Sequence, residues 1–278
     1  FFLSIILIWG GSERLHQKRG VCLTKIFSVI NRKGGVGKTT CAVNIAVCLA
    51  AAGKNVLLVD MDPQGNATTT LGVRKDLGLG TVYHLLSGTK TIESVVMTIH
   101  PPSFHFIMAD TDLVGAEIEL VNCKERERFL QRAIGIQGEA YEFILFDCPP
   151  SLGLLTVNAL VASDGVIVPL QCEFFSIEGF VQTRDTIVWI NRHFGKSITM
   201  DAILFNMFDG SSEKEGFIRE FRGKLDDSVP TWTIHYDHQV NIAPSHFKPG
   251  VCFNPWGVAT REFQDIALHL IETNRGAS

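Results

Sequence analysis

The sequence carries few charged residues. They make up 19% of the 278 residues, and the formal net charge is only −4, with an isoelectric point near 6.1. Long solvated arms are therefore not expected, and the chain as a whole lacks the strong positive charge of a general polyanion binder. Hydrophobic residues make up 46% of the chain, which is ample for a buried core.

The N-terminal apolar run is too short to cross a bilayer. Phe1 to Trp9 covers nine residues, whereas a membrane-spanning helix needs about 20. No basic segment precedes this run and no small-residue cleavage site follows it, which argues against a signal peptide. We expect residues 1–23 to be a disordered or artefactual extension, with the working protein starting near Val21 to Thr24. A weak interfacial anchor is the alternative; stable membrane insertion is not expected.

Closely spaced cysteine pairs are absent as well. The seven cysteines include no C-x-x-C spacing, and their number is odd. Several lie within apolar patterns, where cysteine behaves as a small hydrophobic residue. We therefore expect neither structural disulfides nor a zinc site, and a cytoplasmic location in a reducing environment. Residues 24–278 contain no repeat and no linker, so we expect a single domain there.

Buried apolar strands alternate with helices along the chain. This alternation predicts an α/β fold, with a doubly wound, mostly parallel sheet and helices on both faces. The expected strands are 25–30, 55–59, 104–109, 143–147, 165–170 and 198–207. The expected helices are 38–52, 81–86, 91–98, 113–132, 152–162, 176–194, 212–225 and 259–272, and 233–255 is expected to be irregular.

A glycine-rich turn lies between the first strand and the first helix. It reads Asn31-Arg32-Lys33-Gly34-Gly35-Val36-Gly37-Lys38-Thr39-Thr40. Glycines let successive backbone N–H groups approach an anion, and the helix N-terminus adds unpaired N–H groups and a positive dipole end. Lys38 is placed to reach terminal phosphates, and the Thr39 hydroxyl to ligate Mg²⁺. The candidate nucleotide-binding residues are Gly34, Gly35, Val36, Gly37, Lys38, Thr39 and Thr40; a glycine turn without function is the alternative.

The turn differs from the common phosphate loop, G-x-x-x-x-G-K-[ST]. Arg32 stands at the first glycine position, and Lys33 adds a second lysine. This arrangement resembles the deviant Walker A loop of the ParA/Soj/MinD ATPases, which are P-loop NTPases. The resemblance continues through Val56 to Thr68, Asp147 to Leu160, Pro169 to Gly179 and Ala243 to His246.

The resemblance spans about residues 24–273 and points to the Soj-like chromosome-partitioning branch. It implies ATP and Mg²⁺ as cofactors, and a homodimer that forms on ATP binding. It also implies non-specific DNA binding by that dimer, close to the nucleoid, and hydrolysis stimulated by a ParB/Spo0J-like partner.

Three polar segments follow strands and are expected to meet at one edge of the sheet. They are the glycine turn, the turn with Asp60 and Asp62, and Asp147. We expect Thr39 and Asp147 to hold Mg²⁺, directly or through water; a strand-end turn is the alternative for Asp147. Asp62 is the candidate for positioning the attacking water, and a helix or turn cap is the alternative, especially for Asp60. Cys148 follows Asp147 where many fast ATPases place a carboxylate, so we expect slow basal turnover.

Lys33 is the distinguishing residue of the candidate catalytic set, which also contains Lys38 and Asp62. Lys38 already serves the phosphates from its own loop, so the second lysine needs another role. In the ParA-like family the equivalent lysine reaches across a nucleotide-sandwich dimer to the partner's phosphates. The resemblance implies the same role for Lys33.

One segment departs from the family pattern. The family commonly carries arginines just before Ala-Pro-Ser, whereas residues 234–242 contain neither Arg nor Lys. The remaining basic surface is Arg219, Arg222 and Lys224 on one predicted helix. DNA binding there should fall steeply with salt, and a solvated helix face is the equally weighted alternative.

Other functions share the same ATPase core. A MinD-like membrane positioner would use a basic amphipathic C-terminal helix, but residues 261–275 carry three acids against two arginines. A nitrogenase-type iron protein would need cysteines to hold a cluster between subunits, and Cys148 has no obvious second cysteine. A positioning ATPase for another cargo, such as a plasmid or a protein compartment, differs only in its partner and stays open.

Overall fold

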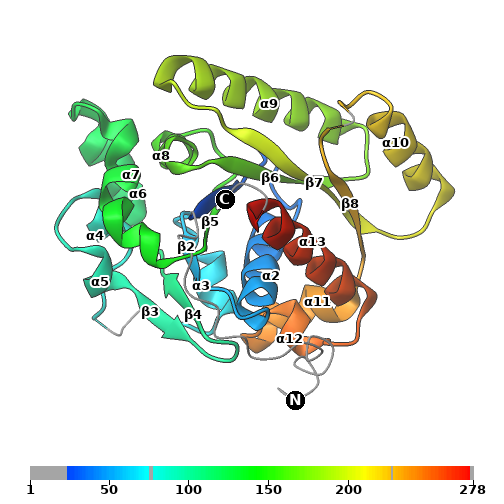
Figure 1. Cartoon of the computed structure of the whole chain (residues 1–278), viewed down its shortest axis with the longest axis horizontal. Coiled ribbons are helices and arrows are strands. Elements are labelled where there is room, and N and C mark those ends of the chain that lie inside the picture. The colour runs from blue at the N-terminus through cyan, green and yellow to red at the C-terminus, as the bar shows by residue number, and fades with distance from the viewer. Residues whose placement is uncertain (1–23, 75–77, 227, 276–278) are drawn as a thin grey trace.

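The computed structural model describes residues 24–74, 78–226 and 228–275. The expectations for residues 1–23 lie outside this described part. Eight strands form one sheet in the order β3-β4-β2-β5-β1-β6-β7-β8 (Figure 1). Neighbouring strands run parallel except at one edge, where β3 is antiparallel to β4. The expected doubly wound, mostly parallel α/β fold is therefore confirmed.

The central strands are buried because helices cover both faces of the sheet. All five residues of β2 and all five of β5 are buried, as is typical of continuous apolar strands in parallel sheets. The strands are β1 (Lys25–Val29), β2 (Val56–Asp60), β3 (Met97–Ile99), β4 (Phe104–Ile107), β5 (Phe143–Asp147), β6 (Gly165–Gln171), β7 (Thr199–Phe208) and β8 (Thr231–His235).

Two hydrophobic clusters, one on each face, hold the helices to the sheet (Figure 1). One face carries α2 (Lys38–Ala51), α3 (Asn66–Thr70), α11 (His238–Ile242), α12 (Gly250–Phe253) and α13 (Val258–Arg275). The other carries α4 (Val82–Leu86), α5 (Ile92–Val95), α6 (Leu113–Glu119), α7 (Phe129–Ile134), α8 (Leu154–Ala162), α9 (Phe175–Phe194) and α10 (Ser212–Arg222). Within the described residues, none of these helices is both long and apolar enough to span a membrane.

Helix α2 brings its N-terminus to the candidate site. Eleven of its 14 residues are buried, so it packs on nearly all sides, as its small apolar residues predicted. It ends where Gly53 adopts a left-handed φ of 78°, a conformation that favours glycine and terminates helices. The predicted strand, glycine turn and helix are therefore all present.

Residues 113–132 do not form the single helix that the sequence predicted. Helix α6 ends at Glu119 and α7 begins only at Phe129. Between them Glu125 has a left-handed φ of 53°. The buried Asn158 side chain of α8 donates to the Arg126 carbonyl at 2.8 Å and accepts from the Leu130 N–H at 3.1 Å. Tertiary hydrogen bonds thus replace the helical ones, although the charged residues alone favour a helix.

Two further predictions of secondary structure were wrong. Residues 91–98 divide into α5 and the start of the edge strand β3, because residues of β3 pair with β4 instead of continuing the helix. Residues 233–255 are not irregular: they contain the end of β8, then α11, a 3₁₀ turn at Ala243–His246, and α12. Strand β8 was missed because only one of its five residues, Ile234, is buried at the sheet edge.

Candidate active site

The carboxyl ends of β1, β2 and β5 meet at one edge of the sheet. Asp147, the last residue of β5, lies beside Val29 of β1 on one side and beside Asp60 of β2 on the other. A cleft of about 800 Å³ opens there. It is lined by Gly34, Gly35, Gly37, Lys38, Thr39, Thr40, Asp62, Pro63, Gln64, Asn66, Thr69, Thr70, Val114, Pro149, Pro150, Ser151, Met207 and Pro244. The glycine turn and the turn after β2 therefore face one cavity, and the turn after Asp147 completes it.

The backbone of the glycine turn requires glycine at two positions. Gly35 and Gly37 have φ values of 73° and 90°, which L side chains rarely adopt. A Cβ at Gly37 would also come within 2.1 Å of Nδ2 of Asn206. That nitrogen donates to the carbonyl of Val36 at 2.8 Å. Strand β7 thus supports the turn from a position far away in the sequence, and Val36 is buried beneath the cleft.

Lys38 begins α2 and lies almost fully buried at the cleft. Its Nζ donates to the Lys33 carbonyl at 3.0 Å, so the ammonium folds back over its own turn. Burial lowers the pKa of Lys38, and the carboxylates of Asp147 and Asp62 oppose this shift. The remaining N–H donors of the ammonium face a polar cleft, which suits an anionic ligand.

Asp147 is the most unusual group of the site. Its side chain is fully buried, and neither carboxylate oxygen has a hydrogen-bond partner among the residues that the structure describes. Burial raises the pKa of Asp147 well above its ordinary value, and the neighbouring Asp60 carboxylate adds to this; the nearby Thr39 hydroxyl opposes the shift. Buried polar groups almost always have a partner. An orphaned carboxylate beside a threonine hydroxyl fits a hard divalent cation or the water bound to it.

Asp60 and Asp62 differ in their surroundings. Asp60 is fully buried and accepts from the Thr68 N–H at 2.9 Å, the Thr68 hydroxyl at 2.7 Å and the Asp62 N–H at 3.2 Å. These bonds connect the end of β2 to α3, so the turn-cap interpretation fits Asp60. Asp62 lines the cleft and accepts from the Gln64 N–H at 2.9 Å. Only Asp62 of the two therefore presents its carboxylate to the cavity.

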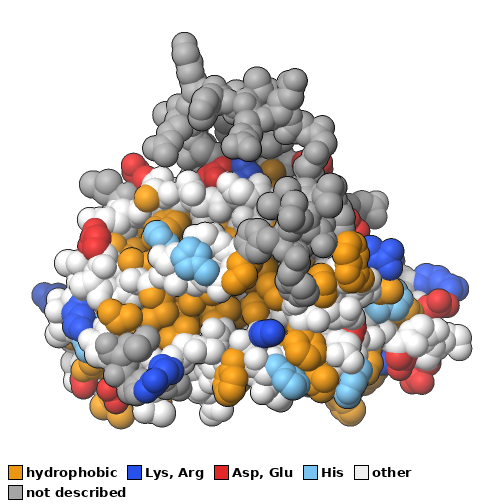
Figure 2. Space-filling view, turned by 90° about the horizontal axis from the view of Figure 1, so that it is seen from below, with side chains coloured by type: hydrophobic (Ala, Val, Ile, Leu, Met, Phe, Trp, Pro, Cys, Tyr) orange, Lys and Arg blue, Asp and Glu red, His pale blue; other side chains and the backbone are white. Residues whose placement is uncertain are grey.

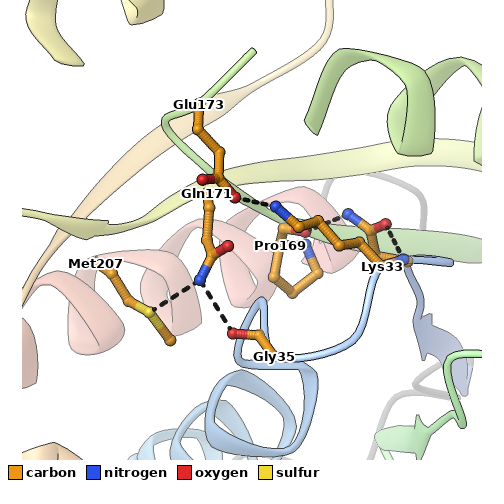
Figure 3. A network of polar contacts seen from close by, with 7 residues as sticks. Lys33, Gly35, Pro169, Gln171, Glu173 and Met207 are labelled. Carbon is orange, nitrogen blue, oxygen red and sulfur yellow. Dashed lines mark hydrogen bonds and ion pairs between the residues drawn. The ribbon is translucent and has the colours of Figure 1, made fainter. Parts of the chain in front are cut away.

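Lys33 points away from the cavity that Lys38 faces. Its Nζ forms an ion pair with Oε1 of Glu173, just beyond β6 (Figure 3). Its N–H donates to Oδ1 of Asn31 at 2.9 Å, and the Nδ2 of Asn31 donates to the Pro169 carbonyl at 2.7 Å. Gln171 adds a bond from Nε2 to the Gly35 carbonyl at 3.2 Å. The end of β6 therefore holds the glycine turn at three points.

Comparison with known proteins identifies the family. A family model described as "AAA domain" matches residues 24–200. The sporulation initiation inhibitor protein Soj of Bacillus subtilis is 39% identical over 244 residues, which cover 87% of this chain and 96% of that protein. The chromosome partitioning protein ParA of Myxococcus xanthus is 40% identical over 252 residues, covering 89% of this chain and 87% of that protein.

The chain belongs to the ParA/Soj family of chromosome-partitioning ATPases. The resemblance read from the sequence motifs is thereby confirmed.

Solved structures share the fold of this chain. Cobyrinic acid a,c-diamide synthase from Mycobacterium smegmatis, with a bound ATP analogue and magnesium, has a TM-score of 0.80 at 28% identity. That alignment covers 92% of this chain and 98% of the synthase. A variant of McdA from Cyanothece in complex with ATP has a TM-score of 0.82 at 17% identity and covers 90% and 97% of the two chains. The latter match shows the shared fold alone.

The predicted DNA-contact residues of this ParA/Soj-family chain lie on α10 and just beyond it. Arg219, Arg222 and Lys224 are all exposed. The Nε of Arg222 donates to the Thr231 hydroxyl at 2.9 Å, and Lys224 pairs with Glu220 at 2.5 Å. Helix α10 carries three acidic residues beside its three basic ones. On the face shown in Figure 2, the described Lys and Arg side chains are scattered and do not form a continuous stripe.

Four polar side chains that support the ParA/Soj glycine turn were not assigned from the sequence. They are Asn31, Gln171, Glu173 and Asn206. Asn31 lies within the turn motif, and Gln171 and Glu173 lie in the segment after residue 169 that matches the family pattern. The motifs therefore marked these three positions, but they did not indicate that the side chains support the glycine turn. Asn206 is 170 residues from its partner Val36, and no local pattern marked it.

Proposed function

We propose that this chain is a nucleotide-driven switch that acts in DNA partitioning. It acts in the cytoplasm, where it binds ATP with Mg²⁺ and forms a homodimer. The dimer hydrolyses ATP to ADP and phosphate slowly, and a ParB-like partner accelerates this hydrolysis. The observation that carries the proposal is the buried, unpartnered carboxylate of Asp147, which adjoins the glycine turn and Lys38. Membership of the ParA/Soj family supports the same activity.

Each polar group of the cleft has a distinct task in this proposal. The N–H groups of the glycine turn and the ammonium of Lys38 bind the phosphates. Thr39 and Asp147 would hold Mg²⁺, which when bound neutralises phosphate charge. Asp62 orients the attacking water, because its carboxylate lines the cleft and the Gln64 N–H fixes one of its oxygens. A cleft of about 800 Å³ has room for a nucleotide.

Slow basal turnover follows from the residue after Asp147. Cys148 is fully buried, and burial raises the pKa of its thiol. A neutral thiol cannot accept a proton from water, so this position supplies no general base. We expect steady-state hydrolysis without a partner to be slower than about 1 per second, the lower end of typical kinase rates. A phosphate-release assay at saturating ATP measures it, and a basal rate well above that limit would contradict a switch.

Homodimerisation is proposed through the surface beside Lys33. Phe174 and Phe175 directly follow Glu173, and the two residues are 77% and 73% exposed. Their rings pack edge to face, with their centroids 5.9 Å apart. Adjacent exposed aromatic rings favour a protein interface. A second copy that docks here would bury both aromatic rings. Lys33 would then lie close to the phosphates of the nucleotide bound to that second copy.

DNA binding by the dimer is proposed through Arg219, Arg222 and Lys224. We expect ATP-dependent retention on non-specific DNA at about 50 mM salt, weakened because Glu220 and its acidic neighbours balance the charge of α10. If the three side chains each neutralise one phosphate, affinity falls about 40-fold between roughly 50 and 200 mM salt. Retention measured with wild type and Arg219→Ala tests this. Retention that is equal in both proteins, or absent at low salt, would favour another cargo.

A further inference from the structure

The ion pair between Lys33 and Glu173 lies outside the cleft and has no part in the chemistry described so far. It joins the glycine turn to the segment between β6 and α9 (Figure 3). Only the side chains of this pair are free to move. The Lys33 N–H is bonded to Asn31 and its carbonyl to Lys38. A change of partner therefore requires the lysine side chain to swing while its backbone stays fixed.

The backbone of Glu173 is equally well held. Its N–H donates to the Gln171 carbonyl at 2.9 Å, and its own carbonyl accepts from the Ser176 N–H at 2.9 Å, in the first turn of α9. The stem of Lys33 lies against that helix, since a Cβ on Gly179 would be only 3.8 Å from the Lys33 Cβ. The fixed backbone of Glu173 thus keeps its carboxylate within reach of the Lys33 ammonium.

We propose that Glu173 is a positioning residue that holds Lys33 on its own subunit until a nucleotide-bound second copy competes for the ammonium. This inference rests on the proposed role of Lys33 in the dimer. Glu173 thereby opposes dimerisation and sets the ATP and protein concentrations at which it occurs. The pair acts as a latch, and its release is coupled to docking because Phe174 and Phe175 adjoin Glu173 on the proposed interface.

Partial exposure makes the latch reversible. The Lys33 and Glu173 side chains are 30% and 47% exposed, and ion pairs in such settings are weak. A triphosphate carries more negative charge than one carboxylate and accepts charge-assisted hydrogen bonds of the same kind. The lysine therefore exchanges one acceptor for a better one when the second copy arrives. The carboxylate left behind is half exposed, so water resolvates it.

The test compares two variants with the same change of charge. Glu173→Gln removes the latch, whereas Glu178→Gln neutralises another exposed acid at the start of α9, whose carboxylate bonds to Gln182. Sedimentation velocity with a slowly hydrolysed ATP analogue gives the dimer dissociation constant. We expect Glu173→Gln to tighten the dimer about threefold, the range of exposed ion pairs, and Glu178→Gln to match wild type. Affinity of the monomer for a fluorescent ATP analogue should be the same in all three.

The outcomes separate this inference from the proposed function beneath it. If Glu173→Gln dimerises as wild type or more weakly, Glu173 does not restrain Lys33 and the inference is wrong, while the dimer itself stands. If Glu178→Gln tightens the dimer equally, the effect is general charge repulsion and the inference is also wrong. If wild type stays a monomer at every ATP-analogue concentration, the proposed dimerisation fails first.

Discussion

Replacing Lys33 by alanine is expected to abolish ATP-dependent dimerisation and to reduce partner-stimulated hydrolysis about 10³-fold. The magnitude follows from other enzymes in which a cation supplied in trans stabilises the transferring phosphoryl group. ATP binding by the monomer should survive, because Lys38 and the glycine turn line the cleft and Lys33 does not. Sedimentation velocity measures the dimer, and fluorescent-nucleotide titration measures the monomer.

Two neighbouring substitutions give this experiment its controls. Arg32→Ala removes an exposed positive charge one residue earlier and should dimerise like wild type. Lys38→Ala should lose nucleotide binding altogether, and therefore also the dimer. A Lys33→Ala protein that still dimerises with ATP would show that its ammonium serves no second subunit, and the proposed switch would need another trigger.

The sequence predicted those features that depend on neighbouring residues. Continuous apolar runs located β1, β2 and β5, and the glycine turn located the start of α2, because burial on both faces and backbone freedom are local requirements. The convergence at the cleft followed from parallel strands whose carboxyl ends share one edge. Asp147 could be placed at that edge from its position alone, although its lack of any hydrogen-bond partner could not.

Features that depend on distant contacts were not predictable. The break between α6 and α7 is stabilised by the Asn158 side chain, which reaches the backbone from α8. The ion pair of Lys33 joins residues 140 apart, and the sequence suggested only that the lysine had a second role. The support of the Val36 carbonyl by Asn206 is longer in range still. Helical propensity and motif spacing contain no information on such pairs.

Replacing Asp147 by asparagine is expected to stabilise the nucleotide-free protein and to remove its stabilisation by Mg²⁺ and ATP. The wild-type carboxylate is fully buried without a partner, and such a group costs about 1–3 kcal/mol. Neutralising it should raise the melting temperature by about 2–4 °C per kcal/mol. The free energy of unfolding of the wild type should rise by about 2.7 kcal/mol at a ligand concentration roughly 100 times the dissociation constant. The variant should not show this rise.

Asp60→Asn provides the matched control for this prediction. Asp60 is equally buried and pairs with Asp147 across neighbouring strands. It differs because Thr68 and the Asp62 N–H satisfy its carboxylate. Removing the charge of Asp60 weakens existing hydrogen bonds, so the melting temperature of Asp60→Asn should lie below that of wild type. The melting temperature of Asp147→Asn should lie above it. Thermal unfolding with and without Mg²⁺ and ATP measures both. A destabilised Asp147→Asn protein that keeps its full response to Mg²⁺ and ATP would show that the orphaned carboxylate is not the metal-binding group.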